Sequence, residues 1–166
     1  MNIFKSIYKK IIWHLINKTF EGTKGFKAKR RMLNRLGHNI GKNTKIVTPC
    51  FLSGKLVTGE NCWIGRNFSL NGNGYCYIGD NVDIGPDVSI LTGSHEIGDS
   101  NRRAGLGKNN DVYIGSGTWI CAKSTILGGK TIGSGSVVGA CSFVNKNVDD
   151  DSFVGGVPAS EIKKLL

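Results

Sequence analysis

The sequence predicts an all-β fold, a single-stranded parallel β-helix of about five coils with an N-terminal helical segment and one protruding loop. Between residues 40 and 144 an aliphatic side chain returns every sixth position, and fourteen of the fifteen members of this series are Ile, Leu or Val. Gly follows eight of the fifteen, as in Ile78-Gly79 and Ile132-Gly133. A period of six fits neither a helix nor an alternating strand, but it fits one short strand plus a corner, repeated three times per coil.

The register also predicts which other side chains point inward. The fifth residue of each hexad is mostly small or β-branched, as an inward position beside a corner requires. These residues include Thr44, Cys50, Val82, Val88, Thr118, Ser124 and Ser136. Cys50 and Cys62 are therefore expected to fill space in the core. Five cysteines without a disulfide-rich spacing favour a reduced, cytoplasmic setting.

The N-terminal segment, residues 1–36, is predicted to be helical and basic. Apolar side chains recur at helical spacing over residues 2–18, with lysines on the other side, and a second, shorter helix is expected around residues 25–36. Residues 1–35 hold ten Lys or Arg against one acid, Glu21. The first helix either caps the open coil of the solenoid or rests, through residues 1–20, on the anionic inner face of a membrane, and the two uses are compatible.

The composition excludes several classes of protein. No run of residues reaches the ~18 consecutive apolar positions needed to span a bilayer. The N-terminus lacks an apolar run followed by a small-residue cleavage site, so secretion is not expected. The basic charge lacks an aromatic platform for stacking bases, which argues against a nucleic-acid partner.

The six-residue register breaks at two places. Eight residues separate Leu70 from Ile78, and this first break is rich in Gly and Asn, as a widened corner would be. The second break follows Ile90 and lasts until Ile114, with a charged, glycine-rich stretch that should project as a loop over residues 94–111. Loops on rigid scaffolds often carry function. The predicted units are therefore the helical segment 1–36, the β-helix 37–157 and a C-terminal tail 158–166.

His95 is the main candidate for a catalytic residue. It is the sixth residue of the hexad that begins at Ile90, so it points outward at the corner where the loop leaves. An imidazole titrates near neutrality and suits a general base. The plain alternative is a solvated surface histidine. His14 and His38 lie outside the repeats and are expected at surface or capping positions.

These features resemble the hexapeptide-repeat acyltransferases. The resemblance rests on the hexads, the histidine-bearing loop and the C-terminal stretch from Gly133 through Gly155-Gly156-Val157-Pro158-Ala159, and it covers residues 40–165. The similar branch holds the galactoside, maltose, serine and polysaccharide O-acetyltransferases. The resemblance implies a left-handed β-helix, a homotrimer and acetyl-CoA sites in the clefts between subunits, without a metal.

The resemblance also implies roles for single residues. His95 matches the catalytic base, and Asn71 matches an asparagine that lines the acceptor pocket of sugar O-acetyltransferases. The implied contacts to the pantetheine arm, the thioester or the CoA phosphates are Trp119, Ala122, Ala140, Lys146, Lys163 and Lys164. The basic N-terminal segment differs from the helical extension of the galactoside-type proteins, so the resemblance does not carry the identity of the acceptor.

Loop residues are expected to contact the substrate. Glu96, Arg102 and Arg103 are the candidates, and either Glu96 or Asp99 could orient His95. Plainer readings stay open: Asn71 could occupy a left-handed turn, Trp119 could pack between subunits, and the paired arginines could be solvated.

The sequence therefore predicts an acetyl-CoA-dependent O-acetyltransferase acting on a saccharide, in capsule, exopolysaccharide or lipid-linked glycan assembly. Alternatives are an N-acetyltransferase acting on an amino-sugar nucleotide and a serine O-acetyltransferase-like enzyme. A zinc hydratase on the same scaffold would need three histidine ligands, and only His95 lies on the repeats. A non-enzymatic scaffold would have no use for the loop at 94–111.

Overall fold

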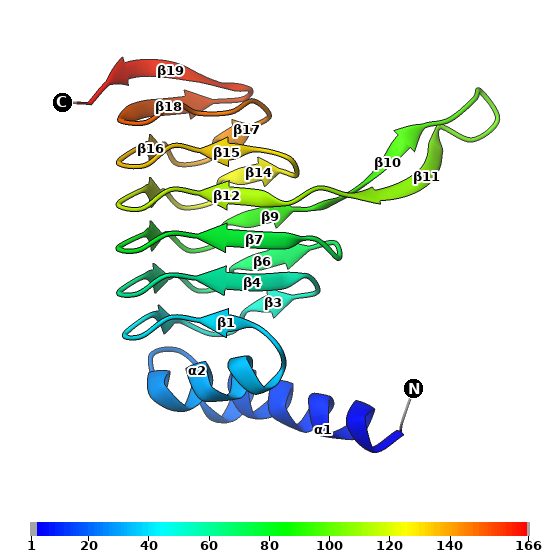
Figure 1. Cartoon of the computed structure of the whole chain (residues 1–166), viewed down its shortest axis with the longest axis vertical. Coiled ribbons are helices and arrows are strands. Elements are labelled where there is room, and N and C mark those ends of the chain that lie inside the picture. The colour runs from blue at the N-terminus through cyan, green and yellow to red at the C-terminus, as the bar shows by residue number, and fades with distance from the viewer. Residues whose placement is uncertain (1–2, 166) are drawn as a thin grey trace.

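A stack of parallel coils forms most of the computed structural model (Figure 1), which describes residues 3–165 apart from the side chains of Ile3 and Lys5. The coils have three faces. Face 1 consists of β1 (Asn39–Ile40), β4 (Lys55–Thr58), β7 (Tyr75–Ile78), β12 (Val112–Ile114) and β15 (Thr131–Ile132). Face 2 consists of β2 (Lys45–Ile46), β5 (Trp63–Ile64), β8 (Asp83–Ile84), β13 (Trp119–Ile120), β16 (Val137–Val138), β18 (Ser152–Gly156) and β19 (Ala159–Lys164). Face 3 consists of β3 (Phe51–Leu52), β6 (Ser69–Asn71), β9 (Ser89–Leu91), β14 (Thr125–Leu127) and β17 (Phe143–Val144).

The described strands make five complete coils and a partial sixth, which confirms the predicted fold class. The near strands of face 1 run leftward in Figure 1 while the chain climbs toward its C-terminus, so the coil is left-handed. Within the predicted tail, β19 (Ala159–Lys164) turns back and pairs antiparallel with β18.

The aliphatic series lines the interior as predicted. Ile64, Ile90 and Ile126 are fully buried, and the small fifth residues of the hexads are buried beside them. The exception in the series, Thr58, keeps its hydroxyl satisfied: Oγ1 accepts from the Gly41 amide at 3.1 Å and donates to the Gly59 carbonyl at 3.1 Å. Cys50 is buried as expected, and burial raises the pKa of its thiol to about 12.

The glycines that follow the aliphatic residues are needed because consecutive coils approach closely at that corner. A Cβ on Gly65 would lie 2.6 Å from the backbone of Gly85, and a Cβ on Gly85 would lie 2.7 Å from the amide nitrogen of Ala122. A larger residue at Gly65 or Gly85 would therefore push the adjacent coils apart.

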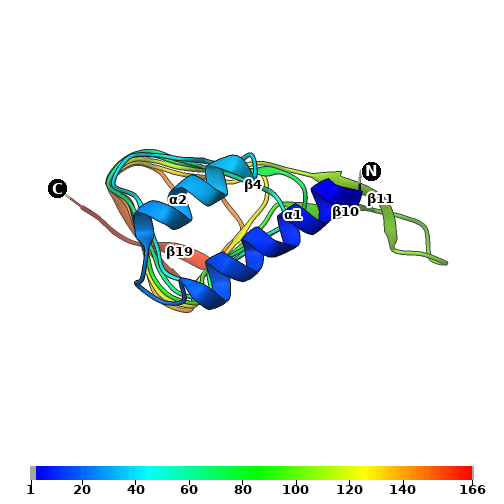
Figure 2. The same ribbon diagram turned by 90° about the horizontal axis from the view of Figure 1, so that it is seen from below.

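Two helices cover the open first coil (Figure 2). They are α1 (Ile3–His14), continued by a π-helical turn η1 (Leu15–Thr19), and α2 (Phe26–Arg35). Ile12, Ile16 and Leu33 are buried against the core, so the helices act as a cap. The predicted helix over residues 2–18 agrees with α1 and η1, except that residue 2 lies outside the described residues.

A buried lysine and a half-buried histidine join this cap to the first coils. The Lys29 ammonium donates to the Gly22 carbonyl at 2.6 Å, and burial lowers its pKa to about 8. His38 lies at a capping position, since its Nδ1 accepts from the Leu56 amide at 3.2 Å, whereas His14 is exposed. Burial, together with a smaller effect of the Lys55 charge, lowers the pKa of His38 to about 4.

Candidate active site

The second break of the register is an antiparallel hairpin rather than an irregular loop. Its strands are β10 (Gly93–Ile97) and β11 (Ala104–Asn109), and it projects from the edge where face 3 passes into face 1 (Figure 1). Most of its residues are exposed, including the large apolar side chains of Ile97 (90%) and Leu106 (78%).

The two breaks of the register meet at the root of this hairpin. Thr92 is fully buried, and both its amide and its hydroxyl donate to the Asn71 carbonyl, at 2.8 and 2.9 Å. The Asn73 amide donates to Oδ1 of Asn109 at 2.9 Å. The hairpin is therefore anchored to the widened corner that begins at Asn71. Sequence reasoning treated the breaks separately and missed Thr92 and Asn109, because a polar residue in a loop gives no signal of its distant partner.

A second pair of contacts strengthens the same junction. The Tyr75 amide donates to Oδ1 of Asp111 at 2.8 Å, and the Gly74 amide donates to the hydroxyl of Thr92 at 3.3 Å. Asp111, which directly precedes β12, thereby fixes the returning strand of the hairpin to the neighbouring coil. The hairpin leaves the solenoid from a defined base.

His95 lies on β10 and points outward, as its register predicts. It faces Gly107 across the hairpin, and a Cβ on Gly107 would lie 4.0 Å from both Cδ2 and Nε2 of the imidazole. Because Gly107 has no side chain, the exposed ring lies over the opposite strand with free space around it. Within residues 3–165, no hydrogen bond or ion pair joins this ring to Glu96 or Asp99.

The neighbouring charged residues mostly shape the hairpin. Glu96 is exposed and lies where the strand register shifts between His95 and Ile97. Oδ1 of Asp99 accepts the amides of Asn101 at 2.9 Å and Arg102 at 3.2 Å, which closes the tip. The Arg103 guanidinium donates to the Gly98 carbonyl at 3.2 Å, whereas the Arg102 side chain is exposed.

Asn71 lies at the same edge as the hairpin. It is the last residue of β6, and its Nδ2 donates to the Ser69 hydroxyl at 3.2 Å. The left-handed residue at this corner is Gly72, with a φ of 102°, so a left-handed turn at Asn71 itself is wrong. The fold thus brings His95 and Asn71, which are far apart in the repeat, to one edge of the solenoid.

The predicted cofactor residues Trp119, Ala122 and Ala140 lie elsewhere. Trp119 is 53% exposed on face 2, between Asp83 and Val137 in register. Ala122 and Ala140 occupy consecutive coils where face 2 turns into face 3, and the Cys141 amide donates to the Ala122 carbonyl at 2.9 Å. Small side chains therefore follow one another along this edge in two consecutive coils.

The three predicted lysines do not form one cluster. Lys163 lies on β19, opposite Phe153, whereas Lys146 is exposed in the turn after β17. The Lys164 ammonium donates to the Ser152 hydroxyl at 2.7 Å and lies 3.7 Å from the Glu161 carboxylate, so it already helps to close the last coil.

A single chain holds two separate halves of the predicted site. The hairpin leaves between face 3 and face 1, because β9 precedes it and β12 follows it. In a three-sided coil this edge is opposite face 2, which carries Trp119. His95 and Trp119 therefore lie on different sides of one chain.

The described residues offer neither a metal-binding cluster nor a membrane-spanning helix. Among residues 3–165, no group of three or more His, Cys, Asp or Glu could hold a metal ion. None of the helices within this range is long and apolar enough to cross a membrane.

The chain is similar in sequence to known acetyltransferases. No family model matches the chain. The chain is 32% identical to the galactoside O-acetyltransferase of Escherichia coli K12 over 140 residues, which are 81% of this chain and 67% of that protein. It is 31% identical to the galactoside O-acetyltransferase of Lactococcus lactis over 137 residues, 81% of this chain and 66% of that protein. The chain thus spans about two thirds of the length of these relatives.

Solved structures share the fold over almost the whole chain. A maltose O-acetyltransferase from Clostridium difficile 630 superposes with a TM-score of 0.85 at 29% identity, over 99% of this chain and 88% of that one. A hexapeptide-repeat acetyltransferase from Vibrio cholerae, complexed with acetyl-CoA, gives 0.84 at 28% identity, over 96% and 86%. These proteins have the coiled fold that the hexads predict.

Proposed function

Because the chain belongs to the hexapeptide-repeat acetyltransferase family that includes the galactoside and maltose O-acetyltransferases, we propose that it transfers an acetyl group from acetyl-CoA to a saccharide hydroxyl. The observation that carries the proposal is the position of His95. Its exposed imidazole stands on a hairpin whose root includes Asn71, the residue expected to contact the acceptor.

His95 acts as the general base in this reaction. Its imidazole takes the proton of the acceptor hydroxyl while the oxygen attacks the thioester carbonyl, and the resulting imidazolium returns a proton to the departing thiolate. Negative charge develops on the carbonyl oxygen in between. A backbone N–H at one of the narrow corners is a suitable preplaced donor for that oxygen.

Face 2 is the proposed surface for acetyl-CoA. Trp119 offers an exposed indole, and Ala122 and Ala140 leave a straight edge without bulky side chains, which suits an extended pantetheine arm. The acetyl-CoA complex of the Vibrio cholerae neighbour and a galactoside acetyltransferase complexed with coenzyme A support this role for the fold. The CoA phosphates are assigned to Lys163 and to Lys146 or Lys164.

The active unit is proposed to be a homotrimer. His95 and Trp119 lie on opposite sides of one coil, so a complete site needs the hairpin of one copy against face 2 of the next. The exposed Ile97 and Leu106 give the hairpin an apolar surface that a neighbour would cover. Such a head-to-tail contact closes into a ring when the rotation is suitable.

Helix α1 is proposed to hold the enzyme at an anionic membrane face. Ile7, Tyr8 and Ile11 are each about half exposed, while Ile12 and Ile16 are buried under the first coil. The exposed apolar side chains lie beside Lys9 and Lys10, the arrangement of an interfacial helix. This location suits a glycan acceptor in capsule, exopolysaccharide or lipid-linked assembly.

The function is tested by release of the CoA thiol with a panel of acceptors. Galactosides, maltose, amino-sugar nucleotides and serine are each supplied with acetyl-CoA, and mass spectrometry identifies the acetylated atom. Release that depends on a neutral sugar and yields an O-acetyl ester supports the proposal. Acetylation restricted to an amine or to serine would replace it with the corresponding alternative.

A further inference from the structure

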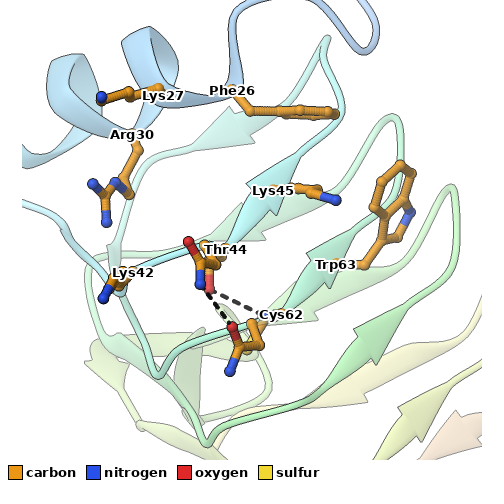
Figure 3. Close-up of a pocket in the computed structure, with 10 residues that line it drawn as sticks. Phe26, Lys27, Arg30, Lys42, Thr44, Lys45, Cys62 and Trp63 are labelled. Atoms are coloured by element: carbon orange, nitrogen blue, oxygen red, sulfur yellow. Dashed lines mark hydrogen bonds between the residues drawn. The ribbon is translucent and has the colours of Figure 1, made fainter.

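A cavity of about 790 Å³ lies between α2 and the first two coils on face 2 (Figure 3). Its lining includes four cations and two aromatic rings: Lys27, Arg30, Lys42, Lys45, Phe26 and Trp63. Phe26, Lys27 and Arg30 come from α2, and the other three come from the coils below it. Among the described residues that line the cavity there is no Asp or Glu.

The charge in this cavity is uncompensated. The described ion pairs of the chain involve Arg66 and Lys164, and none of the four cations of the cavity takes part in one. Arg30 is partly buried, and its Nη1 donates to the Gly41 carbonyl at 3.4 Å, which holds the guanidinium near the cavity. Four like charges around one hollow repel one another, and a bound anion with two or more charges would relieve this repulsion.

The aromatic rings give the cavity a surface for an apolar or flat part of a ligand. Phe26 meets Trp63 edge to face, with ring centroids 5.8 Å apart. The Lys45 ammonium lies 5.9 Å from the centre of the Trp63 ring, and Figure 3 shows this side chain pointing toward the indole. Trp63 is 38% exposed, so it can pack against a flat or apolar group that is attached to the anion.

The position of the cavity separates it from the proposed CoA phosphate contacts. Lys45 lies on β2 and Lys163 on β19, the two ends of the seven-stranded face, six strand spacings or ~29 Å apart. Trp63 lies only two strands, about 10 Å, from Trp119. The cavity therefore continues the proposed acetyl-CoA surface on the side away from the CoA phosphates.

We propose that this cavity binds the diphosphate group of the acceptor, so that the acceptor is a sugar joined through a diphosphate to a nucleoside or to a prenyl lipid. This inference rests on the proposed function. The four cations match the two to three negative charges of a diphosphate, and Arg30 can bind two phosphate oxygens at once. The aromatic pair accepts either a nucleobase or a prenyl chain beside it.

The experiment measures binding in the absence of acetyl-CoA. Uridine diphosphate and farnesyl diphosphate are titrated into the full chain by calorimetry, with uridine and farnesol as uncharged partners. Both diphosphates, or one of them, should bind, with an affinity that falls as salt is added. Binding of only one identifies the source of the diphosphate.

The variants compare charges inside and outside the cavity. Lys42→Ala/Lys45→Ala should weaken diphosphate binding at least about tenfold, since each lost charge removes a charge-assisted contact. Lys24→Ala/Arg31→Ala removes the same charge from exposed positions outside the lining and should change the affinity less than about threefold. Arg30→Ala is a second test, and circular dichroism shows that each variant is folded.

Three results would overturn the inference: no binding of either diphosphate, equal losses in the two double variants, or displacement of the diphosphate by one equivalent of CoA. The last result would assign the cavity to the CoA phosphates. Acetyl transfer is measured separately on the same preparations, with a neutral sugar and a sugar nucleotide as acceptors. Transfer to the neutral sugar without diphosphate binding disproves only the acceptor assignment, and diphosphate binding without transfer to either acceptor disproves only the proposed function.

Discussion

The solenoid body and the hairpin of residues 93–109 are stabilised in different ways. In the body, each coil buries aliphatic side chains and bonds to the coils above and below, so the six-residue period defines the structure. The hairpin has almost no buried side chain and is held by its own strand pairing and by the contacts of Thr92 and Asn109 at its root. The proposed general base His95 thus lies where the stabilising repeat stops, and truncation of an exposed side chain there should affect rate more than stability.

Replacement of His95 by Ala should give the largest functional effect. Loss of a general base costs typically about 10²–10⁴-fold in kcat. The melting temperature should stay within about 1 °C of the wild type, because the side chain is exposed and has no hydrogen bond or ion pair among the described residues. Steady-state kinetics and thermal melting on one preparation check both statements. A variant that keeps more than a tenth of the activity would show that His95 is a surface residue.

A matched pair of apolar truncations tests stability in the two regions. Ile126 is fully buried, so Ile126→Ala should lower the free energy of unfolding by about 2–5 kcal/mol. Leu106→Ala removes an equally apolar side chain from the hairpin, where it is 78% exposed, and should change that free energy by less than about 0.5 kcal/mol. Urea unfolding at a protein concentration that leaves the chain monomeric measures both.

The two variants should differ in the opposite sense when the assembly of the protein is measured. If the hairpin packs against a second copy, Leu106→Ala should weaken the assembly in analytical ultracentrifugation while Ile126→Ala leaves the association constant of the folded chain unchanged. Equal effects of the two variants on unfolding of the monomer would contradict the contrast between body and hairpin.

The same contrast explains what the sequence could predict. The coils, the inward positions and the outward direction of His95 follow from a strict period, because each hexad meets the same neighbours one coil away. The contacts at the root of the hairpin do not follow from the period, because Asn73 and Asn109 are thirty-six positions apart and neither belongs to the repeat. The cavity beside α2 could not be predicted either. It is lined by Arg30 from α2 and Lys45 from β2, and the packing of α2 on this coil leaves no local pattern in the sequence.

A pH titration tests His38, which lies between the helical cap and the first coil. The folded pKa of His38 is about 4, below the ordinary value of 6.5, so the unfolded chain binds the proton more readily between these values. The free energy of unfolding should therefore fall as the pH drops from 6.5 to 4, by roughly 1–2 kcal/mol once solvent screening of this half-buried ring is allowed for.

His38→Asn provides the control for this titration. The asparagine keeps an acceptor for the Leu56 amide but cannot titrate, so its stability should be flatter over the same range. Urea midpoints at several pH values give the comparison. Wild type and variant with the same slope would show that His38 is not the group that titrates.

The smallest expected effect concerns the junction between the two regions. Asn109→Ala removes the acceptor of the Asn73 amide and should lower kcat about three- to fivefold by loosening the base of the hairpin, at a cost of roughly 0.5–1 kcal/mol in stability. Asn109→Asp keeps an oxygen in the same place and should restore most of the rate. Rescue by Asp, with KM for acetyl-CoA unchanged in both variants, would identify Asn109 as a positioning residue. If Ala and Asp are equally slow, the hydrogen bond to Asn73 does not position His95, and the hairpin keeps its direction through Thr92 and its own strand pairing.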